Sequence, residues 1–190
     1  MLKNIIVVND FGFINGGAGK VAITSAKLLA KQAYNVTFLT AVPPIDKELL
    51  ETGVQVICLE QKDILSNPDR LRAMYQGIWN AKAAKTLEGI LAQHDTKETI
   101  VHFHCWMKAL SCSLWKVMAN NQFKVAVTLH DYFLFCPNGG LFDYQELKIC
   151  QKKPSSVSCL FCNCDSRNYL QKIWRFIRQM VQTYWLLKNR

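Results

Sequence analysis

The sequence has no long hydrophobic run. Although 50% of its 190 residues are hydrophobic, no stretch approaches the ~18 consecutive apolar residues that a membrane-spanning helix needs. The apolar run near the amino terminus, residues 5–8, is too short for the core of a signal peptide. Length and composition therefore predict a single globular domain over residues 1–190. We expect a cytoplasmic protein.

Acidic residues are scarce in the last part of the chain. Residues 148–190 contain nine Lys or Arg and one acid, Asp165, so this segment accounts for +8 of the formal net charge of +9. Such an excess favours an anionic partner, and the simpler alternative is a solvated helix face. One functional hypothesis is a basic nucleic-acid-binding module stabilised by zinc. No nucleic-acid recognition motif accompanies the charge, so this hypothesis is weaker than the two that are given below.

The glycine-rich stretch NGGAGKVAIT (15–24) lacks the features of two common nucleotide-binding loops. A Walker loop needs Gly at position 14 and Ser or Thr at position 21, where this sequence has Ile14 and Val21. Gly17-x-Gly19-x-x-Ala22 fits a loose dinucleotide-binding pattern, but no acid follows the second predicted strand. A nicotinamide-dependent oxidoreductase is therefore the second hypothesis.

Small residues at the start of a helix serve one further purpose. They let backbone N–H groups approach an anion, which the helix dipole also favours. The alternative is a tight turn that packs against the sheet.

Apolar β-branched runs alternate with helical patterns along the chain. Strands are predicted near 4–9, 35–40, 54–59, 99–104 and 124–129, and helices near 20–32, 67–93, 108–120 and 169–188. This alternation predicts an α/β fold with a Rossmann-like parallel sheet covered by helices on both faces. A Cys-rich excursion follows the fifth strand.

The last predicted helix has two interpretations. Its Ile173, Ile177, Met180 and Tyr184 recur at helical spacing, and we expect this stripe to pack on the sheet. Its mixture of basic and aromatic residues also suits a membrane interface.

Polar residues follow three of the predicted strands, where parallel sheets bind their ligands. Asn9 and Asp10 end the first strand, His104 lies at the end of the fourth, and His130 and Asp131 end the fifth. We expect His104 to reach the site and His102 to pack on the opposite side of the strand.

Five of the eight cysteines lie between residues 136 and 164. Cys136, Cys150, Cys159 and Cys162 have the spacing C-x13-C-x8-C-x2-C, which suits tetrahedral zinc, with Cys164 as a rival ligand. The sequence thus predicts a structural zinc site that staples the excursion. Reduced thiols or a labile disulfide are the alternatives.

Several segments resemble glycosyltransferase family 4. The stretch NGGAGKVAITSAKLLAKQAYNVTFLT is similar to the opening of that family's amino-terminal domain, and VHFHCW is similar to its fourth-strand His-x-His segment. TLHDYFLFCPNGGLF, with the later Cys-x-x-Cys, resembles a cysteine-bearing subset. The family places two Rossmann-like domains across a cleft (the GT-B arrangement). Its members transfer sugars with retention, usually without a catalytic metal.

The resemblance implies the acceptor-side half of a retaining glycosyltransferase, with a UDP- or GDP-sugar donor and a glycan or lipid-linked acceptor. It implies that the Gly16 and Gly17 amides face the donor's phosphates and that His130 lies near the reacting sugar, where we expect a catalytic role. Taken with the residues at the strand ends, this predicts substrate binding by Asn15, Gly16, Gly17, His104 and Asp131. The family's donor-binding domain has no counterpart in these 190 residues, which predicts a truncated chain that lacks its carboxyl-terminal domain. We expect no cofactor for catalysis, no nucleic-acid partner, and peripheral contact with the inner face of a membrane.

Overall fold

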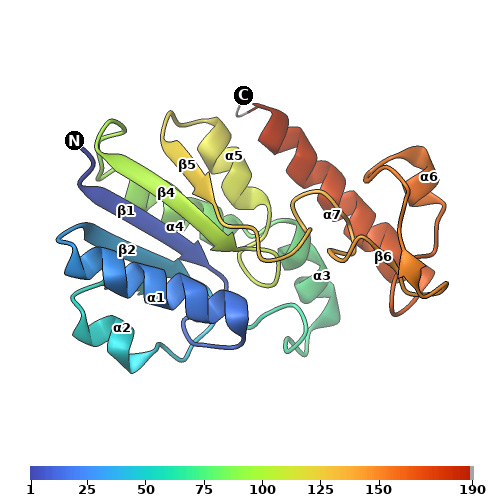
Figure 1. The fold of residues 1–190 in the computed structure, drawn as a ribbon, viewed down its shortest axis with the longest axis horizontal. Coiled ribbons are helices and arrows are strands. Elements are labelled where there is room, and N and C mark those ends of the chain that lie inside the picture. The colour runs from blue at the N-terminus through green and yellow to red at the C-terminus, as the bar shows by residue number, and fades with distance from the viewer. Residues whose placement is uncertain (189–190) are drawn as a thin grey trace. The chain divides into compact units, whose positions relative to one another are not determined.

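The computed structural model describes residues 1–188 and divides the chain into two compact units, Met1–His130 and Asp131–Arg190. The first unit is built on a five-stranded parallel sheet with the order β3-β2-β1-β4-β5 (Figure 1). The strands are β1 (Asn4–Asn9), β2 (Asn35–Thr40), β3 (Gln55–Cys58), β4 (Thr99–Cys105) and β5 (Lys124–Val127). The predicted fold class is confirmed.

Strand β1 is the central strand because its residues are apolar on both faces. Ile6, Val7 and Val8 are fully buried, and β1 pairs with β2 on one side and β4 on the other. The β1–β4 register shifts at the carboxyl end, where Val8 pairs with Phe103 but Asn9 pairs with Cys105. This irregularity leaves His104 without a residue opposite it.

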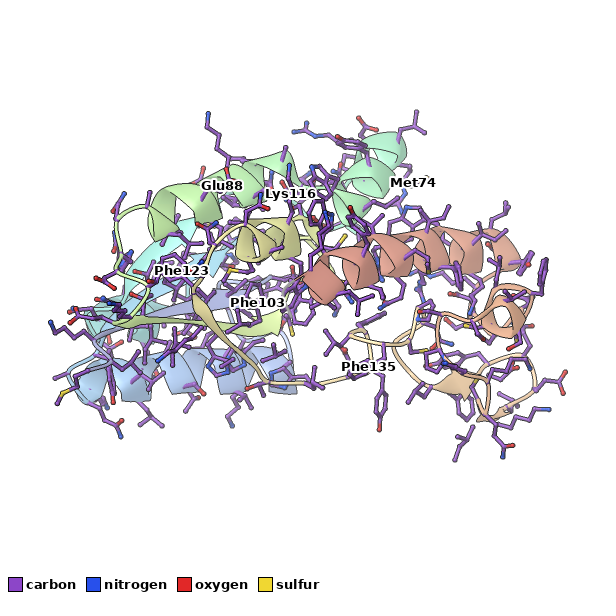
Figure 2. All side chains as sticks on the ribbon, turned by 90° about the horizontal axis from the view of Figure 1, so that it is seen from above. Met74, Glu88, Phe103, Lys116, Phe123 and Phe135 are labelled. Carbon is purple, nitrogen blue, oxygen red and sulfur yellow. The ribbon has the colours of Figure 1, made fainter. Side chains whose placement is uncertain are left out.

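Helices cover both faces of the sheet, as predicted. Helix α1 (Gly17–Lys31) packs its Ala22, Ile23 and Ala26 against Ile5 and Val7 of β1. Helices α4 (Ala81–Leu91) and α5 (Ser113–Ala119) lie on the opposite side of the sheet from α1, where Figure 2 marks them by Glu88 and Lys116. We call the first side the α1 face.

The predicted helix 67–93 is wrong as a single element. The structure has α3 (Arg70–Ile78) and α4, separated at Trp79 and Asn80. The Asn80 side chain caps the amide of Ala83, and its Nδ2 donates to the carbonyl of Ala109 at 2.8 Å. An amide that caps a new helix and binds a distant loop fixes the chain in a non-helical conformation at that point. A short helix that the sequence did not predict, α2 (Lys47–Glu51), is capped by Asp46.

The second unit contains short elements and one long helix. A two-stranded antiparallel ribbon, β6 (Phe142–Asp143) and β7 (Lys148–Ile149), is followed by α6 (Val157–Leu160) and α7 (Tyr169–Lys188). No helix within residues 1–188 is long and apolar enough to cross a bilayer.

The expected apolar core stripe of α7 is wrong. Ile177, Met180 and Tyr184 are exposed, and the helix buries four polar residues instead: Lys172, Arg178, Gln179 and Gln182. The reason is what the helix packs against. The Nε2 atoms of Gln179 and Gln182 each donate to a backbone carbonyl of the 131–140 segment at 2.9 Å, which a hydrocarbon side chain could not satisfy.

Candidate functional site

The strand order defines where a ligand is expected. From β1 the chain proceeds through α1 to β2 on one side, whereas from β4 it proceeds through α5 to β5 on the other. The direction of connection therefore reverses between β1 and β4, and open α/β sheets bind ligands beyond the carboxyl ends of strands at such a point. Asn9, His104 and His130 follow or end the three strands concerned.

The amino terminus of α1 begins beside this edge and has no side-chain cap. Its N-cap residue is Gly16, whose φ of 150° is one that L side chains rarely adopt, and the first turn contains no acidic residue. Gly16 and Gly17 are exposed, and a Cβ on either would meet nothing within 4 Å. Uncapped amides at the positive end of a 15-residue helix form a favourable environment for an anion.

Gly19 is needed for a close approach of the loop to the helix. A Cβ at this position would lie 2.8 Å from Asn15 Oδ1 and 3.2 Å from the carbonyl oxygen of Phe13. The loop thus lies directly on the first turn of α1. It brings three predicted substrate-binding residues, Asn15, Gly16 and Gly17, to the same helix start.

The histidines of β4 and the segment after β5 form a connected row. His104 Nδ1 lies 3.1 Å from His130 Nε2, and His102 Nε2 lies 2.8 Å from Thr128 Oγ1. The ring centroids of His102 and His104 are 4.2 Å apart. The expectation that His102 packs on the opposite side is therefore wrong, because residues two apart on a strand share a face.

Burial keeps His104 neutral. It lowers the pKa of His104 to about 3, and the neighbouring His102 and His130 rings act in the same direction. Burial, followed by the charge on His130, also lowers the pKa of His102. His104 Nδ1 and His130 Nε2 share one hydrogen bond, which orients the His130 ring against the buried His104 ring.

Two buried polar atoms at the reversal point lack hydrogen-bond partners among residues 1–188. They are His104 Nε2 and Asn9 Oδ1, on side chains that are 3% and 1% exposed. By strand alternation Asn9 lies on the same face as Val7, which is the α1 face. His102 also lies on that face, since it lines a cavity of about 440 Å³ together with Leu28 of α1. Unpaired buried polar groups in a native site require a partner such as water or a ligand.

Asp10 does not belong to the ligand-binding set. Its carboxylate is buried and accepts hydrogen bonds from the backbone amides of Lys108, Ala109 and Leu110, each at 2.9 Å. Burial raises the pKa of Asp10, and these three donors oppose the rise. The side chain ties the end of β1 to the segment after β4. The helix predicted from residue 108 begins later, as α5, at Ser113.

Asp131 belongs to the second unit and has a local contact. The exposed carboxylate accepts the amide of Phe133 at 2.9 Å, which is a common turn-forming contact. Its predicted contact with substrate stays a prediction.

The structure does not gather the predicted zinc ligands. Cys136 Sγ donates to Asn138 Oδ1 at 3.1 Å, and Cys162 Sγ donates to Asp143 Oδ2 at 3.4 Å. Within residues 1–188 no three His, Cys, Asp or Glu side chains are placed to hold a metal ion. The Cys136, Cys150, Cys159 and Cys162 zinc site therefore stays a prediction.

Two of the buried thiols instead surround a lysine. Lys172 Nζ donates to Cys164 Sγ at 3.1 Å and to Cys159 Sγ at 3.3 Å. Burial opposes the charge on Lys172, but the hydrogen bond to Cys164 and the nearby sulfurs hold its pKa above the usual range. Asn138 Nδ2 also lies 3.4 Å from Cys164 Sγ, so Cys164 is the centre of this network.

Sequence reasoning missed the partners of the residues that it identified. Thr128 could have been found by period-two alternation, because it lies two residues before His130 in the extended segment that follows β5. Lys172 gave no signal, since a lysine on an amphipathic helix is usually solvated.

Comparisons with known proteins give one informative relative. The chain is 28% identical over 150 residues to an uncharacterized 42.6 kDa protein in the cps region of Klebsiella pneumoniae. The match covers 73% of this chain and 39% of the relative, so the chain spans about two fifths of that protein. No protein-family model matches the sequence. No solved structure matches it significantly.

Proposed function

We propose that the chain is the acceptor-side domain of a retaining glycosyltransferase that acts in capsule or related polysaccharide synthesis. The observation that carries this proposal is that an uncapped helix terminus and a hydrogen-bonded pair of histidines, buried His104 and half-buried His130, lie at one edge of a parallel sheet. The cps-region relative supports the polysaccharide context. The resemblance of the glycine loop and the His-Asp-Tyr segment to family 4 supports the reaction type.

The chemistry of sugar transfer suits these groups. Departure of a nucleoside diphosphate develops negative charge on the phosphate, and preorganised N–H groups stabilise such charge. The amides at Gly16 and Gly17 supply them in this proposal. His130 hydrogen-bonds a sugar hydroxyl through Nδ1, because the neutral His104 ring engages the other ring nitrogen, His130 Nε2. His104 is then a positioning residue.

The phosphate half of the proposal is tested with the chain itself. Addition of UDP or GDP to ¹⁵N-labelled protein should shift the amide resonances of residues 16–19 in a saturable, weak manner. Gly17→Val places a branched side chain over the first-turn amides and should weaken binding about tenfold or more, as expected for a lost charged contact. Gly89→Val is the matched control, since Gly89 is also a helical glycine with open space around its Cβ. Shifts confined to other regions, or none, would contradict the proposal.

The catalytic half needs a longer protein that contains this sequence as its first part. His130→Ala should abolish turnover there while the circular dichroism spectrum stays unchanged. Full turnover of this variant would exclude the assigned role.

The alternative oxidoreductase hypothesis is tested in the same titration. NAD and NADP should produce no shifts beyond those of a nucleoside diphosphate. Tight binding that depends on the nicotinamide ring would favour the oxidoreductase instead.

A further inference from the structure

The second unit exposes large aliphatic and aromatic side chains at one end. Five of them between residues 147 and 170 are 72–78% exposed: Leu147, Ile149, Val157, Phe161 and Leu170. Within the described part of the first unit, only Met1 and Leu71 exceed these values. Such exposure in water is unfavourable, and grouped apolar residues on a surface mark interaction sites.

These residues lie on three segments that hydrogen bonds hold together. The ribbon is tied to the segment after α6 by Tyr144 N to the Cys164 carbonyl, at 3.3 Å, and by Gln145 Nε2 to the Asp165 carbonyl, at 2.7 Å. The Tyr169 hydroxyl donates to the carbonyl of Leu160 at 3.1 Å, which ties the start of α7 to α6. Figures 1 and 2 both show the ribbon and α6 beside the same end of α7.

Positive charge is interleaved with the apolar residues. Lys148, Lys152, Lys153 and Arg167 are all exposed. Glu146 is the exposed acid of this region and pairs with Lys148 at 3.5 Å. The other two acids are buried and engaged internally: Asp143 binds Cys162, and Asp165 pairs with Arg175 at 3.0 Å. We call the five apolar and four basic residues the basic–apolar end.

This composition matches a lipid surface better than a macromolecule. Protein interfaces are depleted in lysine, whereas lysines and aliphatic side chains together are typical of surfaces that bind anionic bilayers. Single-stranded nucleic acid is bound by stacking on aromatic rings, and four of the five apolar residues are aliphatic. We infer that the basic–apolar end docks on an anionic phospholipid membrane, with its aliphatic side chains at the headgroup boundary and its basic residues on the lipid phosphates.

The test is sedimentation of the intact chain with vesicles. Binding is expected to phosphatidylglycerol–phosphatidylcholine vesicles, to fall as salt rises, and to be weak with phosphatidylcholine alone. Lys152→Gln combined with Lys153→Gln should weaken binding about 30-fold, from the attraction that two cations contribute near an anionic surface. Phe161→Gln combined with Leu170→Gln should weaken it to a similar extent.

Two matched controls use exposed residues of the first unit. Leu50→Gln alters an exposed leucine next to Glu51 on α2, and Lys85→Gln alters an exposed lysine on α4. Both should leave vesicle binding unchanged. The inference is overturned if anionic vesicles do not bind, if the controls weaken binding as much as the basic–apolar variants, or if RNA or a protein partner displaces the vesicles from this surface. None of these readouts depends on sugar transfer, so the glycosyltransferase proposal and this inference can fail separately.

Discussion

At the scale of single residues, the candidate site depends on one buried imidazole. The side chain of His104 is buried. It makes one hydrogen bond to His130, and its Nε2 atom has no hydrogen-bond partner within residues 1–188. Burial disfavours the charged form of this ring, so His104 should make the free energy of unfolding depend on pH.

Stability should fall as the pH falls through the range in which an unfolded histidine titrates. The folded pKa of His104 is about 3, below the unfolded value of ~6.5, so its contribution is complete above pH ~6.5 and declines toward pH ~3. Between pH 7 and pH 5 we expect a loss of about 2 kcal/mol from this group. Urea unfolding at both pH values should show a smaller loss for His104→Gln. An identical slope in both proteins would contradict the assignment.

Removal of the Asp10 carboxylate should be costly although it contacts no substrate. Asp10→Ala leaves three backbone amides without an acceptor, two of them buried, and we expect a loss of about 3 kcal/mol in the free energy of unfolding. Asp95→Ala is the control, because Asp95 is exposed and caps one turn, and it should cost about 0.5 kcal/mol or less. Equal losses would show that Asp10 is not a structural clamp.

The sequence predicted where the candidate site residues lie along the chain better than it predicted the partners they bind. His104 and His130 could be assigned from their positions at strand ends, since that rule depends only on the local pattern. Asp10 has the same position but a different role, because its donors lie 98–100 residues later in the chain. No local pattern contains that information.

At the scale of elements, the first turn of helix α1 contains two glycines with different surroundings. Gly17 faces open space, whereas Gly19 is in contact with the loop that precedes the helix.

Strands and helix types were predictable from periodicity, but the inner and outer faces of α7 were not. Its neighbours are backbone carbonyls, so the usual rule that the apolar face is buried did not apply.

The two glycines should respond oppositely to alanine. Gly19→Ala should lower the free energy of unfolding by about 2 kcal/mol, because its methyl group would overlap Asn15 and the Phe13 carbonyl. Gly17→Ala should be neutral or raise stability by about 0.5 kcal/mol. Thermal unfolding of the two variants measures this difference, and a tolerated Gly19→Ala would show that the loop can move away from the helix.

Metal content tests the interpretation of the Cys-rich segment. Protein prepared without chelator should contain about one zinc per chain, lost in Cys159→Ser and in Cys162→Ser. Cys105→Ser, at a half-buried thiol of β4, should retain it. Elemental analysis that finds no zinc in the wild type would leave the Lys172 network as the organising feature of this unit.

At the scale of the whole molecule, the proposed chemistry requires more than the described sheet. A nucleoside diphosphate is stabilised by donors around all of its phosphate oxygens, and in the proposed site the α1 terminus would contact it from one direction only. Each contact missing from the transition state costs on the order of 3 kcal/mol. Residues 1–190 alone should therefore give no measurable sugar transfer from any nucleotide sugar. Detection of a glycosylated product with the isolated chain would refute this.

The Asp10 clamp also dictates when the site can form during synthesis. The chain emerges from the ribosome amino terminus first, so Asp10 and the glycine loop appear long before the amides of Lys108, Ala109 and Leu110. Until those amides arrive, the carboxylate at the end of β1 has none of its three backbone donors, although β2 and β4 precede them in the chain and can already pair with β1. A nascent chain that stalls before residue 108 should therefore present its glycine loop to chaperones and proteases. Release of residues 108–110 should tie the end of β1 to the segment after β4, whereas the sheet and the histidine pair are complete only after β5 and His130 have emerged.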